Sequence, residues 1–205
     1  LYLDYLDALN THFEQYPYLL GWRPSIGDFG LIAPMYAHLG RDPHPAKLMQ
    51  QRAISVHRWV ERMNRSDQDV PEFFCAGTDF VENDEVPESL MAVLRVLAED
   101  FVPETLAAAD AIDGWLSVNK PEAGVPAVGR LAQAPGTATF DLRGEKIEAL
   151  AQPHRFYLLQ RVQDHYRSLS ESDKVGVDSV LAESGMAAIL KATLSRRIER
   201  ADNLE

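Results

Sequence analysis

The chain has 205 residues, of which 46% are hydrophobic, enough for one or two globular domains with a buried core. No window approaches the ~18 uninterrupted apolar residues of a membrane-spanning helix, and a single cysteine excludes an internal disulfide framework, so we expect a cytoplasmic protein that does not enter a membrane. The net charge of −11 is concentrated in residues 67–113, where Arg95 is the only basic residue, which argues against nucleic-acid binding through this segment.

The first thirteen residues have the apolar spacing of an amphipathic helix, with Leu3, Leu6, Leu9 and Phe13 on one face. The first residue already lies inside this pattern. Because a free helix end needs capping groups, we expect that a further segment precedes Leu1.

A second helix has the clearest start in the sequence. Ser25 and Asp28 have the spacing of a capping box, in which the hydroxyl and the carboxylate satisfy each other's backbone N–H groups. The residues that follow, 29–39, are apolar nearly all round, which predicts a central and buried helix. Pro34 predicts a kink, for which Gly30 leaves room four residues earlier, and Gly40 is expected to end the helix.

We expect the rest of the chain to form loops, helices and one hairpin. A loop with Pro43 and Pro45 leads into an apolar stripe over 48–63, and an acidic loop that packs by its aromatic residues follows over 64–86. The remaining expected elements are a long helix over 88–115 that Pro103 bends or divides, a linker over 120–136, a short β-hairpin over 137–150 turning at Gly144, and helices over 153–169, 171–184 (capped by Ser170) and 186–200.

Two segments resemble the glutathione transferase superfamily. Residues 18–31 are similar to the motif that leads into a buried helix of the family's C-terminal domain, with Leu-Leu-Gly before the Ser25 and Asp28 capping box. Residues 59–63 are similar to the Trp-x-x-Arg-Met that ends the family's next helix. Gly27 stands where the family usually has alanine, which should weaken the first helical turn by about 1 kcal/mol.

The resemblance implies an all-α helical bundle like the C-terminal domain of a glutathione transferase. We expect residues 1–64 to form that core, truncated at its start, and residues 65–205 to form an acidic loop and a helical extension packed on it. The family's thioredoxin-like N-terminal domain, which binds glutathione and supplies the catalytic Ser, Tyr or Cys, is not in this chain. The resemblance therefore implies no catalytic residue here, that domain as a partner, and a homodimer as a further partner.

Two functions fit this resemblance. In the first, the intact protein conjugates or reduces a small electrophile with glutathione, and the helix around Met35 and Tyr36 lies close to the acceptor-substrate pocket. In the second, the chain is a non-catalytic module that keeps the scaffold for binding or protein interaction. A thioredoxin-like βαβ unit upstream would favour the enzyme. A third alternative is an unrelated helical domain that resembles the family by chance.

Other reactive residues favour structural roles. Cys75 lies among acidic residues with no nearby base to lower its pKa, which is typical of a packed structural cysteine. His38, Asp42 and His44 lack a second ligand pair, so we expect no metal site. Ser25 and Asp28 are interpreted as a structural cap and not as catalytic residues.

Overall fold

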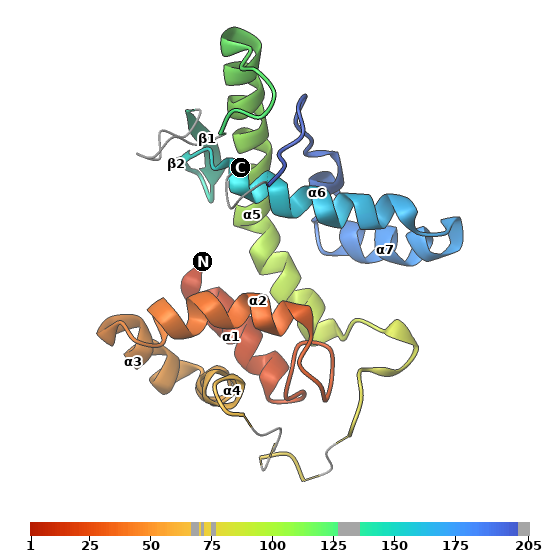
Figure 1. The fold of residues 1–205 in the computed structure, drawn as a ribbon. Helices are drawn as coiled ribbons and strands as arrows, with labels where there is room; N and C mark the ends of the chain where they lie inside the picture. The colour runs from red at the N-terminus through yellow and green to blue at the C-terminus, as the bar shows by residue number, and fades with distance from the viewer. Residues whose placement is uncertain (67–69, 71, 75–76, 127–135, 201–205) are drawn as a thin grey trace. The chain divides into compact units, whose positions relative to one another are not determined.

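A computed structural model describes residues 1–66, 70, 72–74, 77–126 and 136–200 of the chain (Figure 1). It is mostly helical, with one two-stranded antiparallel sheet, which confirms the helical prediction and the hairpin expected over 137–150. The chain divides into two compact units, Leu1–Leu97 (unit 1) and Ala98–Glu205 (unit 2). Cys75 and most of the linker expected over 120–136 lie outside the described residues.

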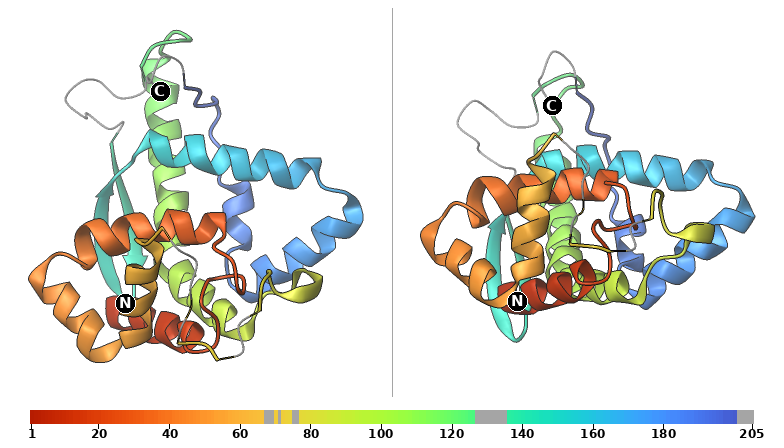
Figure 2. Two further views of the ribbon diagram at one scale, coloured as in Figure 1. Left: turned by 60° about the horizontal axis from the view of Figure 1, so that its bottom comes forward. Right: turned by 90° about the horizontal axis from the view of Figure 1, so that it is seen from below.

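Unit 1 is built around a pair of packed helices, α1 (Tyr2–Phe13) and α4 (Ile54–Met63). Both α2 (Ile26–Pro34) and α3 (Pro43–Arg52) contact α4, and the path of these helices can be followed in Figure 2. Apolar side chains of α1, α4 and the first turns of α5 (Glu88–Asn119) form the core: Leu6, Leu9, Phe13, Val56, Trp59, Val60, Leu90 and Val93.

Two prolines expected in a loop instead lie in the first turn of α3, so that prediction was wrong. Pro43 is its first residue and Pro45 follows in the same turn. The first N–H groups of a helix have no intrahelical acceptor, so proline costs little there. The stripe over 48–63 is also two helices and not one, because the backbone at Ala53 leaves the helical region (φ −136°, ψ 61°).

Pro34 changes the type of helix. The α-helical part of the second helix ends at Pro34, and residues Met35–Leu39 continue as a π-helical segment with Gly40 at its end. Proline has no N–H to donate to the carbonyl four residues earlier, so the α-helical hydrogen-bond ladder is interrupted there. The sequence predicted the position of this interruption and of the helix end.

The connector between α1 and α2 pairs with the acidic segment. Gly21 forms isolated antiparallel bridges with Tyr18 and Phe80, at a φ of 114° that favours glycine. A Cβ on Gly21 would also lie 2.8 Å from the backbone nitrogen of Val81. The conformation and the close approach together explain the glycine of the Leu-Leu-Gly motif.

The aromatic residues of the acidic segment behave differently from one another. Phe73 packs edge-on against Trp22, with ring centroids 5.5 Å apart. Phe74 is 100% exposed, and Phe80 is only half-covered, under the guanidinium of Arg23. The expectation that this segment packs by its aromatic residues therefore holds for Phe73 and fails for Phe74.

Unit 2 contains the C-terminal part of α5, the hairpin of β1 (Thr137–Leu142) and β2 (Glu145–Leu150), and the helices α6 (Pro153–Ser168) and α7 (Glu171–Glu183). Arg143 and Gly144 form the two-residue turn with φ values of 53° and 87°, as a type I′ turn requires. Pro103 lies inside α5 without dividing it. Figures 1 and 2 show α6 and α7 joined by a short turn as a helical hairpin.

The last predicted helix is mostly absent. The hydroxyl of Ser170 caps α7 by accepting from Asp173 N at 3.2 Å, as predicted. The helix expected over 186–200, however, is only a 3₁₀ segment, Ala187–Lys191. Within the described part of the chain, no helix has the length and apolar character needed to cross a membrane.

Candidate functional site

The capping box predicted from the sequence is present at the start of α2. Ser25 N donates to Asp28 Oδ2 at 2.8 Å, and Asp28 N donates to Ser25 Oγ at 3.4 Å. The Ser25 hydroxyl also donates to Asp28 Oδ2 at 2.8 Å. The Asp28 carboxylate is fully buried, at 0% exposure, so its negative charge depends on these donors and on the positive end of the helix.

The other carboxylate oxygen of Asp28 reaches beyond its own helix. Oδ1 accepts from the Leu19 backbone N–H at 3.1 Å and from the Trp59 indole Nε1–H at 3.0 Å. The single side chain therefore joins the connector, the start of α2 and the middle of α4. The indole ring of Trp59 in turn stacks on Phe13 of α1, with centroids 4.9 Å apart. We call this arrangement of Leu19, Ser25, Asp28 and Trp59 the Asp28 hub.

Arg62, the arginine of the Trp-x-x-Arg-Met segment, is a second buried charge near the hub. Its Nη2 donates to the Pro17 carbonyl at 2.7 Å, and its Nη1 forms an ion pair with Glu72. The guanidinium lies over the rings of Tyr18 and Phe73, and burial lowers the pKa of Arg62. Within the described residues its Nε–H is buried without an acceptor. Arg62 thus fixes the connector and the acidic segment against α4.

His12, which the sequence analysis did not single out, is fully buried in unit 1. Its Nε2 lies 3.2 Å from the Tyr18 carbonyl and its Nδ1 lies 2.9 Å from Ser89 Oγ. A carbonyl can only accept, so Nε2 carries the proton and Nδ1 accepts from the Ser89 hydroxyl. Burial lowers the pKa of His12, which favours this neutral form. Helical spacing alone could have placed His12 on the buried face of α1.

The face of α2 that points away from α4 is exposed, against the prediction of a central, buried helix. Ile26 is 92% exposed and Phe29 61% exposed, and Ala33, Pro34 and Ala37 continue the exposed surface. We call these five residues the α2 face. A helix that is apolar all round needs a neighbour on every side, whereas α2 fully buries only Asp28 and packs Leu31 and Ile32 partly against the core. An apolar surface of this kind is typical of a docking site.

Met35 and Tyr36, the residues proposed to lie near a substrate pocket, have different surroundings. Met35 is buried in the core of unit 1. Tyr36 is exposed at the end of the α2 face, with the Arg41 guanidinium 5.1 Å from its ring centroid. Only Tyr36 is therefore accessible to a ligand in this structure.

Residues considered for metal binding do not converge. His38, Asp42 and His44 lie around the turn between the π-helical segment Met35–Leu39 and α3, and each of the three is exposed. Across residues 1–66, 77–126 and 136–200 and the few described positions between, no three His, Cys, Asp or Glu side chains are grouped to hold a metal ion.

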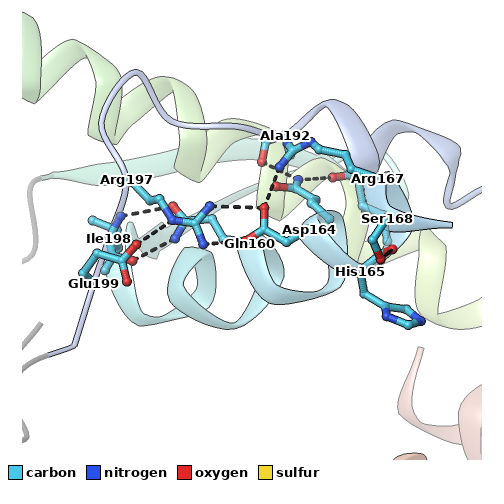
Figure 3. A network of polar contacts seen from close by, with 11 residues as sticks. Gln160, Asp164, His165, Arg167, Ser168, Ala192, Arg197, Ile198 and Glu199 are labelled. Atoms are coloured by element: carbon cyan, nitrogen blue, oxygen red, sulfur yellow. Dashed lines mark hydrogen bonds and ion pairs between the residues drawn. The ribbon is translucent and has the colours of Figure 1, made fainter.

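In unit 2, two glutamines of α6 hold the C-terminal segment (Figure 3). Gln160 pairs with the backbone of Ile198 in both directions, donating to its carbonyl at 2.8 Å and accepting from its N–H at 3.1 Å. Gln163 donates to the carbonyls of Ile189 and Ala192. These side-chain amides form hydrogen bonds with backbone N–H and C=O groups that a helix over 186–200 would have paired with one another. This competition accounts for the absence of that helix.

An arginine pair on α6 and the C-terminal segment completes this network. Arg197 forms a two-pronged ion pair with Asp164, with nitrogen–oxygen distances of 2.5 and 3.2 Å, and its Nε donates to Glu199. Arg167 donates to the same Asp164 carboxylate. The hydrogen bond from Arg197 lowers the pKa of Asp164. The carboxylates of Asp164 and Glu199 are therefore both ion-paired with Arg197.

No protein-family model, curated protein sequence or solved structure matches this chain.

Proposed function

We propose that this chain is the helical, acceptor-substrate half of a glutathione-transferase-like protein that conjugates or reduces a small electrophile with glutathione. The Asp28 hub is the observation that carries the proposal. Two separate segments, residues 18–31 and 59–63, carry the resemblance, and the hub joins them through the hydrogen bond from Trp59 Nε1 to Asp28 Oδ1. The two motifs thus belong to one structural unit, which supports a common origin.

The α2 face supports a partner domain. Among the described residues of unit 1, Ile26 and Phe29 are the most exposed large apolar side chains apart from Phe74. Covering each side chain would contribute about 1.5–3 kcal/mol to association. In the proposal, a thioredoxin-like domain lies on this face, binds glutathione and supplies the Ser, Tyr or Cys that activates its thiol. Tyr36, at the end of the face, then borders the acceptor substrate.

Glutathione conjugation to 1-chloro-2,4-dinitrobenzene by the full-length protein tests the proposal. Phe29→Asp should lower this activity strongly, because a carboxylate on the α2 face opposes the docking of an apolar partner surface. Phe74→Asp is the matched control, since Phe74 is also an exposed phenylalanine but belongs to the acidic segment and not to α2. Activity that is absent from the full-length protein would contradict the enzyme and favour the non-catalytic scaffold.

Size measurement by light scattering separates a homodimer from a domain contact. If two copies of the chain pair through the α2 face, Phe29→Asp converts a dimer into a monomer. If the face covers a thioredoxin-like domain of the same protein, the mass is unchanged and only the activity falls.

A further inference from the structure

A small pocket lies in unit 2, beside the last turns of α5. Its volume is about 150 Å³. Its apolar walls come from three parts of the chain: α5, the segment that follows α5, and the segment around the start of α6 and residue 198. The apolar residues are Ile112, Trp115, Leu116, Val125, Pro153 and Ile198. A volume of about this size is enough for a single benzene-sized ring.

The walls are held by specific hydrogen bonds. Asp113 Oδ1, on α5, accepts from both the N–H and the hydroxyl of Ser195, at 2.9 and 2.8 Å. The guanidinium of Arg196 donates to the Pro121 carbonyl, and Gln160 holds the backbone of Ile198. The C-terminal segment is therefore tied to α5, to the chain after α5 and to α6, and all three contribute residues to the pocket.

The two arginines at the pocket differ in what they bind. Arg197 is ion-paired with two carboxylates, those of Asp164 and Glu199. Arg196 donates to one backbone carbonyl and forms no ion pair with a carboxylate in the part of the chain that the structure describes. A guanidinium offers several N–H donors in one plane, which match the two oxygens of a carboxylate. Arg196 thus has spare donors beside the apolar walls of the pocket.

We propose that this pocket binds a small monocarboxylic acid. Its apolar body, about the size of one six-membered ring, lies against Trp115, and its carboxylate is hydrogen-bonded by Arg196. Glu122 also borders the pocket, and its negative charge disfavours a ligand with a second acidic group. The inference concerns unit 2 alone and does not depend on the proposed reaction with glutathione.

Benzoate is the first probe, with benzyl alcohol and benzylamine as neutral and cationic analogues. Binding to the 205-residue chain is followed by the indole N–H signal of Trp115 in two-dimensional NMR. Only three tryptophans are present, so Trp115→Phe identifies this signal. We expect benzoate to shift it saturably at millimolar concentration, and benzylamine to bind about 10-fold more weakly because it loses the charge-assisted hydrogen bonds.

Arg196→Gln should weaken benzoate binding about 10-fold, while the backbone amide signals of β1, β2 and α7 stay in place and report that unit 2 is still folded. Arg161→Gln is the matched control, because Arg161 lies on α6, donates to the Tyr157 hydroxyl and does not border the pocket. Glu122→Gln should tighten binding. Absence of any Trp115 shift, equal binding of benzoate and benzylamine, or unchanged affinity in Arg196→Gln would each overturn the proposal.

Discussion

Removing the Asp28 carboxylate should cost far more stability than removing the Ser25 hydroxyl, although the two form one capping box. Ser25→Ala deletes a cap and leaves Asp28 its remaining donors, which predicts a loss of about 1 kcal/mol. Asp28→Ala leaves the backbone N–H groups of Leu19 and Ser25 and the indole N–H of Trp59 without an acceptor. At about 1–3 kcal/mol for each unsatisfied donor, with partial rehydration, the expected loss is roughly 3–5 kcal/mol.

Urea unfolding followed by tryptophan fluorescence measures this difference. A Trp115→Phe background confines the signal to unit 1, where Trp22 and Trp59 lie. With a urea dependence of about 1–2 kcal/mol per molar, the midpoint of Asp28→Ala should lie at least about 1 M below that of Ser25→Ala. If Asp28→Ala does not fold, Asp28→Asn gives the same comparison. The substitution replaces one accepting oxygen by an NH₂ group, which then faces N–H donors without an acceptor between them. Equal midpoints for the two positions would refute the hub.

Further predictions concern other buried or strained groups. Because burial lowers the pKa of His12 below its ordinary value of 6.5, the unfolded chain binds the proton more tightly. The free energy of unfolding should therefore fall as pH drops below about 6.5, and His12→Gln should remove this slope in pH-dependent urea titrations. Both Gly21 and Gly144 have positive φ, but only Gly21 faces nearby backbone. Thermal unfolding should show a loss of roughly 3 kcal/mol for Gly21→Ala and about 1 kcal/mol for Gly144→Ala. Gln160→Leu should speed hydrogen exchange at the Ile198 amide, because it removes the side-chain oxygen that accepts from this N–H.

Local chemistry was sufficient to predict several parts of the fold. The spacing of Ser25 and Asp28 gave the cap, Pro34 gave the interruption of the second helix, and Gly144 gave the hairpin turn. Each of these depends on residues within a few positions of one another. The partner of Asp28 on α4 could not be predicted in the same way, because Trp59 lies 31 residues further along the chain.

The failures arose where a segment's surroundings decide its structure. Composition showed that α2 is apolar all round, but it could not show that Ile26 and Phe29 stay exposed among the residues that the structure describes. The helix expected over 186–200 gave way to hydrogen bonds from Gln160 and Gln163, which lie on another helix. The pocket beside Trp115 also joins distant segments, so no local motif marked it.

Calorimetric titration of glutathione is the most direct test of the central proposal. The full-length protein and the 205-residue chain are titrated side by side under the same conditions. We expect glutathione to bind the full-length protein and not this chain, because the proposed thiol site belongs to the thioredoxin-like domain. Absence of binding to the full-length protein would contradict a glutathione-transferase-like function, and equal binding to both would contradict the assignment of the site to another domain.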